Sequence, residues 1–343
     1  MAKKLYILTL TLLMVLTANA QYAGYAIGFY NLENLFDTQH DEGKNDFEFL
    51  PDGSNAWTEL KYQSKLKNMA QVLAEMGTDK SPEGCAFIGV SEVENANVLN
   101  YLINQEPLKA RKMEYCHIDG PDKRGVDCGL LYNPKYFTVN SVDLVPYIYT
   151  KPEDEGHATR GFLTIKGKMA GDDVCVIVCH WPSRGATAFY RNEGGRQVRE
   201  LKDQILKDNK HTKVFVMGDM NDDPSNESMT THLGCKSEID DVKKGDMYNP
   251  WYNIHKKGTG TLAWDGAWNL FDQIVISPHL LNKKGEKDFS TLKYHSCQIF
   301  RRPYLFQTEG KYKGNPKRTH AGGSWLNGYS DHLPVVMYLA KKI

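Results

Sequence analysis

Six short stretches of the sequence place a carboxylate, an amide or a histidine where an apolar run stops. They cover residues 28–33, 88–92, 176–184, 214–222, 270–275 and 329–334. A single polar residue in such a place usually belongs to a turn, because Asp and Asn stabilise turns through local backbone hydrogen bonds. Six such stretches together are hard to assign to turns alone. Polar strand ends that meet at one edge of a sheet form the place where α/β folds commonly bind ligands.

The side chains in these stretches point to one kind of chemistry. Carboxylate and amide oxygens suit Mg²⁺, Mn²⁺ or Ca²⁺ rather than zinc. Asp219 and Asn221 lie two residues apart, so on an extended segment both face the same side, where one can accept a proton from water and the other can orient it. The serine hydrolase, P-loop and zincin motifs are absent from the sequence. The sequence therefore predicts metal-assisted attack of water on a phosphoester.

Short apolar segments, a few helical segments and long polar loops have to position these side chains. Their Val, Ile, Phe and Tyr content and their Gly, Pro, Asp and Asn borders predict strands at 23–30, 85–92, 126–132, 139–149, 162–168, 174–179, 214–217, 270–276 and 335–339. Apolar residues at helical spacing predict helices at 61–76 and 195–208. Strands that follow one another both directly and through helices indicate mixed sheets. No internal repeat or linker divides residues 21–343, so we predict one domain.

The first twenty residues have the pattern of a secretory signal peptide. Two lysines precede an apolar run from residue 5 to about 16, and an Ala-Asn-Ala site allows cleavage after Ala20. The run is shorter than the roughly 20 residues that span a membrane. An uncleaved N-terminal anchor is the alternative. We expect export to the periplasm or the extracellular space, with no membrane insertion of the mature chain.

The composition gives the chain no global attraction to a polyanion. The 343 residues include 42 Lys and Arg against 42 Asp and Glu, so an affinity for nucleic acid has to come from a local patch. All seven cysteines follow residue 20. Export permits disulfides, but an odd number leaves at least one thiol without an intrachain partner, and four of the seven lie in predicted strands. We therefore expect mostly buried free thiols, which pack as small apolar residues.

The ordered set of motifs resembles the deoxyribonuclease-I-like endonuclease/exonuclease/phosphatase superfamily. The positions that carry the resemblance are Asn31-x-Glu33, Glu92, Arg124-Gly125-x-Asp127, His180, Asp219-x-Asn221, Asp272 and Ser330-Asp331-His332. They follow the order of the family from about residue 26 to 339. The resemblance implies an α/β (α+β) fold, namely a single-domain, four-layer sandwich of two mixed β-sheets flanked by helices, with the site at one edge.

The resemblance also implies a metal site. Glu92 corresponds to the main metal carboxylate of the family, and Asn31, Glu33 and Asp331 lie around the same ion or its waters. Mg²⁺ is the expected ion, with Mn²⁺ or Ca²⁺ as alternatives. A folded relative that has lost catalysis is the alternative for the whole set of positions.

Further positions correspond to residues that act on water and phosphate. Asp219 resembles the residue that activates the attacking water, and Asn221 the amide that orients this water and the phosphate. His332 resembles the imidazole at the scissile phosphate, with Asp272 fixing and polarising its ring. His180 matches the second histidine of the nuclease branch, which would assist the leaving oxygen as a general acid.

Several segments bear on the substrate. The loop of Arg124 and Asp127 is expected to shape the edge of the site, and Arg184 to bind a flanking phosphate. Segment 301–318 carries six basic residues, one acidic residue and interleaved aromatics, which suits a nucleic acid, although a solvated loop explains it equally well. The acidic segment 37–52 is interpreted as a solvated loop, with a structural calcium site as the alternative.

These observations predict an exported, monomeric, divalent-metal-dependent phosphodiesterase that acts on nucleic acid, in particular an endonuclease. A phosphomonoesterase or a lipid phosphodiesterase of the inositol phosphate or sphingomyelin type is the alternative. A binding module that retains the fold but not turnover is a further alternative. The sequence leaves open DNA versus RNA, endo versus exo action and the number of metal ions.

Overall fold

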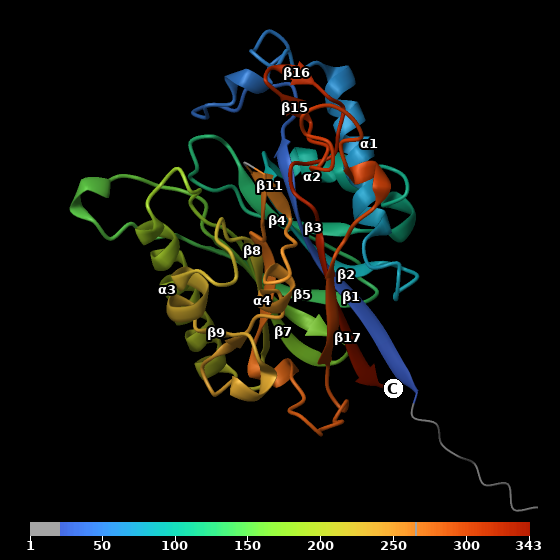
Figure 1. The fold of residues 1–343 in the computed structure, drawn as a ribbon, viewed down its shortest axis with the longest axis vertical. Helices are drawn as coiled ribbons and strands as arrows, with labels where there is room; N and C mark the ends of the chain where they lie inside the picture. Colours follow the sequence, from blue (N-terminus) through green and yellow to red (C-terminus); the bar gives the residue numbers. More distant parts are fainter. Residues whose placement is uncertain (1–20, 265) are drawn as a thin grey trace, which may run out of the picture.

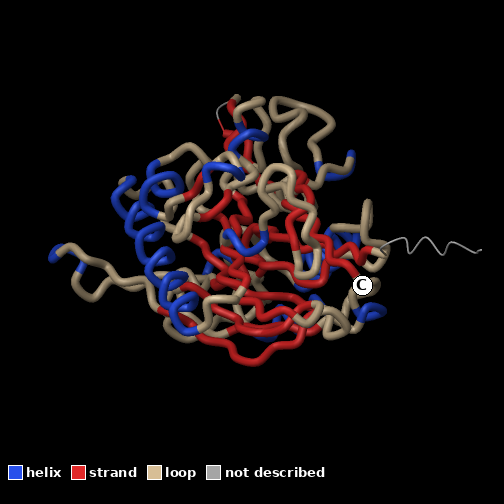
Figure 2. Tube along the Cα trace, turned by 90° about the horizontal axis from the view of Figure 1, so that it is seen from below, coloured by secondary structure: helices blue, strands red, loops and turns tan. Residues whose placement is uncertain are grey.

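Two mixed β-sheets pack face to face, and helices cover the outer face of each sheet (Figure 1). The computed structural model describes residues 21–264 and 266–343, so the signal peptide predicted at 1–20 lies outside the described residues. Seen from below, the strands fill the interior, and helices and loops lie around them (Figure 2). This arrangement confirms the predicted four-layer sandwich and its single domain.

The first sheet has six strands in the order β14-β17-β1-β2-β4-β3. Only β1 and β2 run parallel to each other, and the other neighbours are antiparallel. The long β1 lies in the middle because both its flanks pair with other strands. The strands are β1 Tyr22–Leu35, β2 Cys85–Val93, β3 Glu114–His117, β4 Asp127–Tyr132, β14 Lys293–Ile299 and β17 Val335–Lys342.

The second sheet has seven strands in the order β5-β6-β7-β8-β13-β10-β9. The parallel pair β7 and β8 lies near its centre, and β13 pairs antiparallel with β8. The strands are β5 Phe137–Val145, β6 Phe162–Met169, β7 Asp172–His180, β8 Lys213–Asp219, β9 Cys235–Lys236, β10 Met247–Tyr248 and β13 Asp272–Ile276. Two small hairpins are formed by β11 Leu262–Trp264 with β12 Ala267–Asn269, and by β15 His320–Ala321 with β16 Ser324–Trp325.

Among the described residues, three helices of eight residues or more complete the outer layers. These are α1 Glu59–Glu75, α2 Ala96–Ile103 and α3 Ala188–Asp208, and a single turn, α4, spans Tyr252–His255. In α1, Leu66, Met69 and Leu73 are buried at helical spacing against the first sheet. In α3, Val198 and Ile205 pack against the second sheet.

The core follows from the alternation of side chains along each strand. In β1, Ile27 and Phe29 face the second sheet, whereas Ala26 and Tyr30 face the helices α1 and α2. The apolar layer between the sheets also includes Phe87, Leu130, Val176, Phe215 and Ile274. The strands therefore have no freedom to slip by one residue, because a slip would turn their apolar faces outward.

Each predicted strand and helix has a counterpart in the structure. The helix predicted at 61–76 is α1, and the one predicted at 195–208 is the second half of a longer α3 that begins at residue 188. Short or largely polar elements were not predicted from the sequence, namely α2, α4, β3, β9, β10, β11, β12, β14, β15 and β16. The seven cysteines form no disulfide, and six of them are buried, as expected. Among the described residues, none of the helices combines the length and apolar character needed to cross a membrane.

Candidate active site

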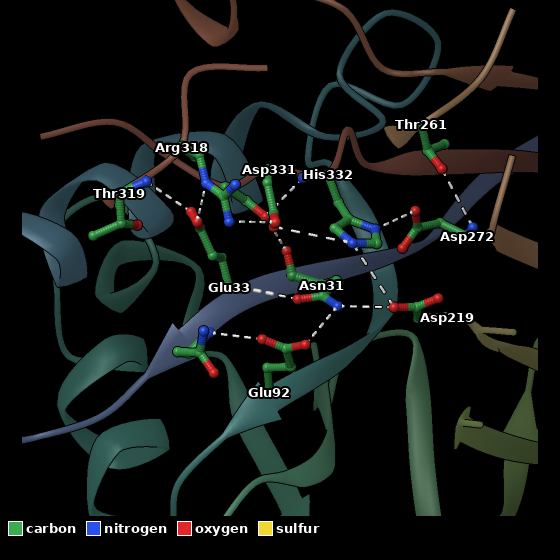
Figure 3. Close-up of polar contacts among 12 residues, drawn as sticks. Asn31, Glu33, Glu92, Asp219, Thr261, Asp272, Arg318, Thr319, Asp331 and His332 are labelled. Atoms are coloured by element: carbon green, nitrogen blue, oxygen red, sulfur yellow. Dashed lines mark hydrogen bonds and ion pairs between the residues drawn. The ribbon is translucent and has the colours of Figure 1, made fainter. Parts of the chain in front are cut away.

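The strand order brings the predicted polar side chains to one edge of the sandwich (Figure 3). On the second sheet, His180 at the end of β7 and Asp272 at the start of β13 both pair in register with Asp219 at the end of β8. Residues that pair in register point to the same face of a sheet, so these three side chains stand side by side. On the first sheet, Asn31 of β1 pairs in register with Ser91, one residue before Glu92.

The amide of Asn31 joins the two sheets. Its Nδ2 donates a hydrogen bond to Asp219 Oδ2 at 3.0 Å and another to Glu92 Oε1 at 3.3 Å. The Glu92 carboxylate also accepts a hydrogen bond from the Asn34 N–H at 3.0 Å. Glu92 has a φ of 59°, in the left-handed region, which costs on the order of 1 kcal/mol for a residue other than glycine. Strain of this kind persists where the surroundings fix the backbone, as they do here.

His332 and Asp272 form a buried pair. His332 Nδ1 lies 2.7 Å from Asp272 Oδ2, and Nε2 lies 3.8 Å from Asp219 Oδ2. The Ser330 hydroxyl positions the histidine, because it donates to the Asn31 carbonyl and accepts from the His332 N–H. Burial alone would lower the pKa of His332, but Asp272 and Asp219 outweigh burial and raise this pKa well above its usual value. His332 is therefore a cationic hydrogen-bond donor at neutral pH.

Asp219 has the properties of a base near neutral pH. Burial, followed by the negative charges of Asp272 and Glu92, raises its pKa to about 7, against the opposing effect of His332. Its second oxygen accepts a hydrogen bond from the Asn221 N–H at 2.9 Å, and Asn221 itself has a φ of 50°. The Asn221 side chain donates to the Trp181 carbonyl at 3.0 Å, which fixes the amide beside the end of β7.

His180 differs from His332 in its electrostatic surroundings. Its Nε2 lies 3.7 Å from both Glu92 Oε1 and Asp219 Oδ2, without a hydrogen bond to either among the described residues. Burial, together with Arg160 and Arg124, lowers the pKa of His180 well below its usual value. The side chain is therefore a neutral imidazole at pH 7. The general-acid role predicted from the sequence requires that it first takes up a proton.

The donor set fits a divalent cation. Glu92 is partly exposed, Asp219 and Asp272 are buried, and one oxygen of Asp272 has no hydrogen-bond partner among the described residues. Asp219, Asp272 and His332 present ligand atoms that all lie within 4.8 Å of one another. Carboxylate oxygens without thiolates favour Mg²⁺ or Mn²⁺. Glu92 lies beside this group, because the Asn31 amide hydrogen-bonds both Glu92 and Asp219.

Of the three predicted substrate-binding residues, Arg124 and Arg184 are exposed and Asp127 is buried. Arg184 donates hydrogen bonds to Asn221 O, Asn269 Oδ1, Asp223 Oδ2 and Asn226 Oδ1 and stacks on the Phe271 ring, so protein groups already occupy its guanidinium. Arg124 is exposed and donates to Asn34 Oδ1 at 3.0 Å. Asp127 accepts two hydrogen bonds from the Gly120 N–H, which closes the loop that carries Arg124.

The sequence analysis missed a charged network beside the site. Arg318 donates to Glu33 Oε1 at 3.0 Å and to Asp331 Oδ2 at 2.9 Å (Figure 3). The Thr319 N–H donates to Glu33 Oε2 at 2.7 Å. Buried Lys65 of α1 donates to Thr319 Oγ1 and to the Tyr329 carbonyl. Nothing in the helical pattern of α1 marks Lys65, and Arg318 counted only as one charge of the basic segment 301–318.

This fold and geometry agree with a family match over nearly the whole chain. The model of the Endonuclease/Exonuclease/phosphatase family matches residues 26–341. The chain belongs to this family. Endonuclease/exonuclease/phosphatase enzymes hydrolyse phosphoric esters and depend on divalent metals, and the acidic cluster described above could bind such a metal. Among curated proteins, none matches the sequence significantly.

Solved structures of the endonuclease/exonuclease/phosphatase family share the fold. A family protein from Bacteroides thetaiotaomicron has 15% identity and a TM-score of 0.57, covering 94% of this chain and 97% of its own. A mannosyl-6-phosphatase from the same organism has 16% identity and a TM-score of 0.56, covering 92% and 99%. D. rerio TDP2, complexed with a single-strand DNA product, has 12% identity and a TM-score of 0.53, covering 92% and 99%. The fold thus hosts both phosphodiester and phosphomonoester chemistry.

Proposed function

We propose that the protein is an exported, divalent-metal-dependent phosphodiesterase that hydrolyses nucleic acid. The observation that supports it most directly is the convergence of Glu92, Asp219 and the His332–Asp272 pair on one sheet edge. Glu92 is proposed as the main metal ligand, with Asn31 and Asp331 near the ion or its waters. When bound, the ion would polarise a phosphoryl oxygen and neutralise developing charge.

The protein's own side chains then divide the work. Asp219 would accept a proton from the attacking water, since its pKa of about 7 lets it do so near neutral pH. Asn221 would orient this water. His332 would donate its Nε2–H to the phosphoryl oxygen, because Asp272 holds the opposite ring nitrogen. His180, which is neutral at pH 7, would have to take up a proton before it could assist the leaving oxygen as an acid.

A phosphomonoesterase is the second candidate, and the state of the arginines supports it. Arg302 pairs with Asp79, Arg318 pairs with Glu33 and Asp331, and Arg301 stacks between Trp268 and Phe306. The basic segment 301–318 therefore offers less free charge to a polyanion than its sequence suggests. The similar fold of a mannosyl-6-phosphatase supports a small phosphoester as the alternative substrate class.

A substrate panel tests the proposal. The protein comprising residues 21–343 should be incubated with plasmid DNA, single-stranded DNA, RNA, a phosphoinositide, sphingomyelin and mannose 6-phosphate, each with Mg²⁺, Mn²⁺, Ca²⁺ or a chelator. Cleavage of a nucleic acid that stops in chelator is the expected result. Phosphate release from the sugar phosphate without cleavage of any nucleic acid would replace the proposal with the second candidate.

A further inference from the structure

We propose that Arg318 and Lys65 take the place of a second metal ion on the Glu33–Asp331 side of the site, so that the protein binds a single divalent ion on the Glu92 side. The inference rests on the proposed metal-dependent function. It assigns Glu33 to Arg318 rather than to an ion, although the sequence motif Asn31-x-Glu33 predicts a metal carboxylate there.

Protein donors already bind the Glu33 carboxylate. Its carboxylate is buried, and its two oxygens each accept a hydrogen bond, one from Arg318 Nε at 3.0 Å and one from the Thr319 N–H at 2.7 Å (Figure 3). An ion that approached Glu33 would have to bind beside the Arg318 guanidinium, whose positive charge opposes it. The backbone of Glu33 has a φ of 48°, in the left-handed region.

Asp331 is bound from one side only. Its Oδ2 accepts a hydrogen bond from Arg318 Nη2 at 2.9 Å, while Oδ1 lies 4.0 Å from His332 Nε2 and faces the centre. A guanidinium that bridges two carboxylates in this way uses its planar donor geometry, which suits such pairs better than an ammonium does. Arg318 thus links Glu33 to Asp331, as a bridging metal ion would.

Lys65 supplies the second positive charge. Its side chain reaches from α1 under the site, is 1% exposed, and donates to Thr319 Oγ1 at 2.6 Å and to the Tyr329 carbonyl. Burial lowers the pKa of Lys65 to about 8, and Glu33 and Asp331 are the acidic groups that most oppose this effect and favour its charge. The segment 317–332 is therefore anchored to the helix layer through a cation.

The charges on the two sides of the site differ. Glu33 and Asp331 carry two negative charges, and Arg318 with Lys65 balances both. The other side has three carboxylates, those of Glu92, Asp219 and Asp272. Within the described part of the chain, their ion-pair partners are His180 and His332. Among the described residues, no arginine or lysine forms an ion pair with any of these three carboxylates. One divalent ion near Glu92, Asp219 and Asp272 would supply the missing positive charge. On the Glu33–Asp331 side, Arg318 and Lys65 already supply it, which leaves no charge for a second ion to balance.

Counting bound Mn²⁺ tests the inference without any substrate. Isothermal titration calorimetry and electron paramagnetic resonance of free Mn²⁺ should give one ion per wild-type chain. Arg318→Gln frees the Glu33 and Asp331 carboxylates, and the variant should bind a second, weaker Mn²⁺. Arg302→Gln is the matched control, because Arg302 also pairs with an acidic partner, Asp79, but away from the site, and it should still bind one ion.

Two results would overturn the inference. One is a wild-type protein that binds two Mn²⁺ ions, and this outcome needs no variant at all. The other is a folded Arg318→Gln protein, with its circular dichroism unchanged, that still binds one. If Arg318→Gln does not fold, the wild-type count decides, and Arg318→Lys, which keeps the charge, should retain one ion. A wild-type protein that hydrolyses no phosphoester would defeat the proposed function and leave the ion count valid.

Discussion

At the scale of single residues, the two histidines of the site are distinguished by their neighbours. His332 lies between Asp272 and Asp219, which raise its pKa, whereas His180 is buried near Arg160 and Arg124, which lower its pKa together with burial. A protonated His332 can donate a hydrogen bond to the phosphate whatever the leaving group is. A neutral imidazole can act as an acid only after it has taken up a proton, so His180 matters only for a step that includes a proton transfer.

This difference predicts separate effects of two alanine variants. His180→Ala should reduce cleavage of natural nucleic acid by about 100-fold or more, because a sugar alkoxide is a poor leaving group. The same variant should barely slow bis-nitrophenyl phosphate, whose nitrophenolate leaves without an acid. His332→Ala should slow both substrates by about 100-fold or more. Steady-state rates on the two substrates decide, and equal losses in both variants would contradict this division of roles.

Glu92 is predicted to be essential. Glu92→Gln keeps the shape of the side chain but removes the charge that holds the ion, so activity should fall by about 100-fold or more. Glu83→Gln is a matched control, since Glu83 precedes the same strand but is exposed and paired with Lys135. Hydrolysis should be measured with and without chelator. Full turnover by the wild type in excess chelator would refute the metal requirement.

The raised pKa of Asp219 predicts how pH affects metal binding. Below about pH 7 a proton occupies this carboxyl and removes a negative charge beside the ion site, so Mn²⁺ affinity should weaken as pH falls. Above pH 7 the same group should add no further change. Calorimetric titrations from pH 5.5 to 8 test this, with Asp219→Asn expected to flatten the slope. A wild-type affinity that stays constant from pH 5.5 to 7 would show that Asp219 does not contribute.

At the scale of elements, the loop after β7 and the loop after β8 depend on one side chain. Arg184 binds the Asn221 carbonyl and the Asp223 carboxylate, and Asn221 in turn reaches back to Trp181. The guanidinium therefore ties the two loops together at the point where water would be oriented. The sequence analysis predicted Arg184 as a phosphate ligand, and the observed contacts favour a positioning role.

Arg184→Lys should lower kcat with little change in KM. Lysine keeps the charge but cannot reach four acceptors at once, so Asn221 would shift, and a displacement of about 1 Å can cost about 100-fold in rate. Arg199→Lys, in the exposed part of α3, is the control. A variant with an increased KM and an unchanged kcat would instead support phosphate binding by Arg184.

The elements also show why sequence reasoning succeeds in some places and fails in others. The predicted strands are apolar on at least one face, and their period is visible within a few residues. Helix α2 is eight residues long, and β14 is half-polar, so neither gives a clear period. The Glu33–Arg318 ion pair joins residues 285 positions apart, and no local pattern indicates such a partner. The motifs predicted which polar groups would meet. They did not predict that the guanidinium groups of Arg184 and Arg318 are hydrogen-bonded to protein groups, because these partners are brought together only by the tertiary fold.

At the scale of the whole molecule, the first and last described residues lie side by side. The Ile343 N–H donates to the Gln21 carbonyl at 2.9 Å, beside the paired ends of β1 and β17. Only the segment before Gln21 is predicted to be a signal, and removing it leaves every strand of the sandwich intact. Processing at this point is therefore compatible with the fold.

Expression of the full sequence in a Gram-negative host should give a periplasmic protein that starts at Gln21. Intact-mass measurement and N-terminal sequencing check this, because loss of residues 1–20 is a large and discrete change. A matched control replaces Ala18 and Ala20 with bulky residues, which should block cleavage. A wild-type product that retains Met1 and sediments with membranes would support the uncleaved anchor instead.

The amide of Asn31 has a consequence for how the protein should inactivate. It is the group that hydrogen-bonds both Glu92 on one sheet and Asp219 on the other, so the two halves of the site keep their spacing only while the sheets keep their alignment. A shear of the two layers by about 1 Å would separate the water-activating half from the ion-binding half and leave secondary structure unchanged. Activity should therefore be lost at lower urea concentrations than the circular dichroism signal of the folded protein. Loss of turnover would thus report misalignment of the two sheets before the protein unfolds.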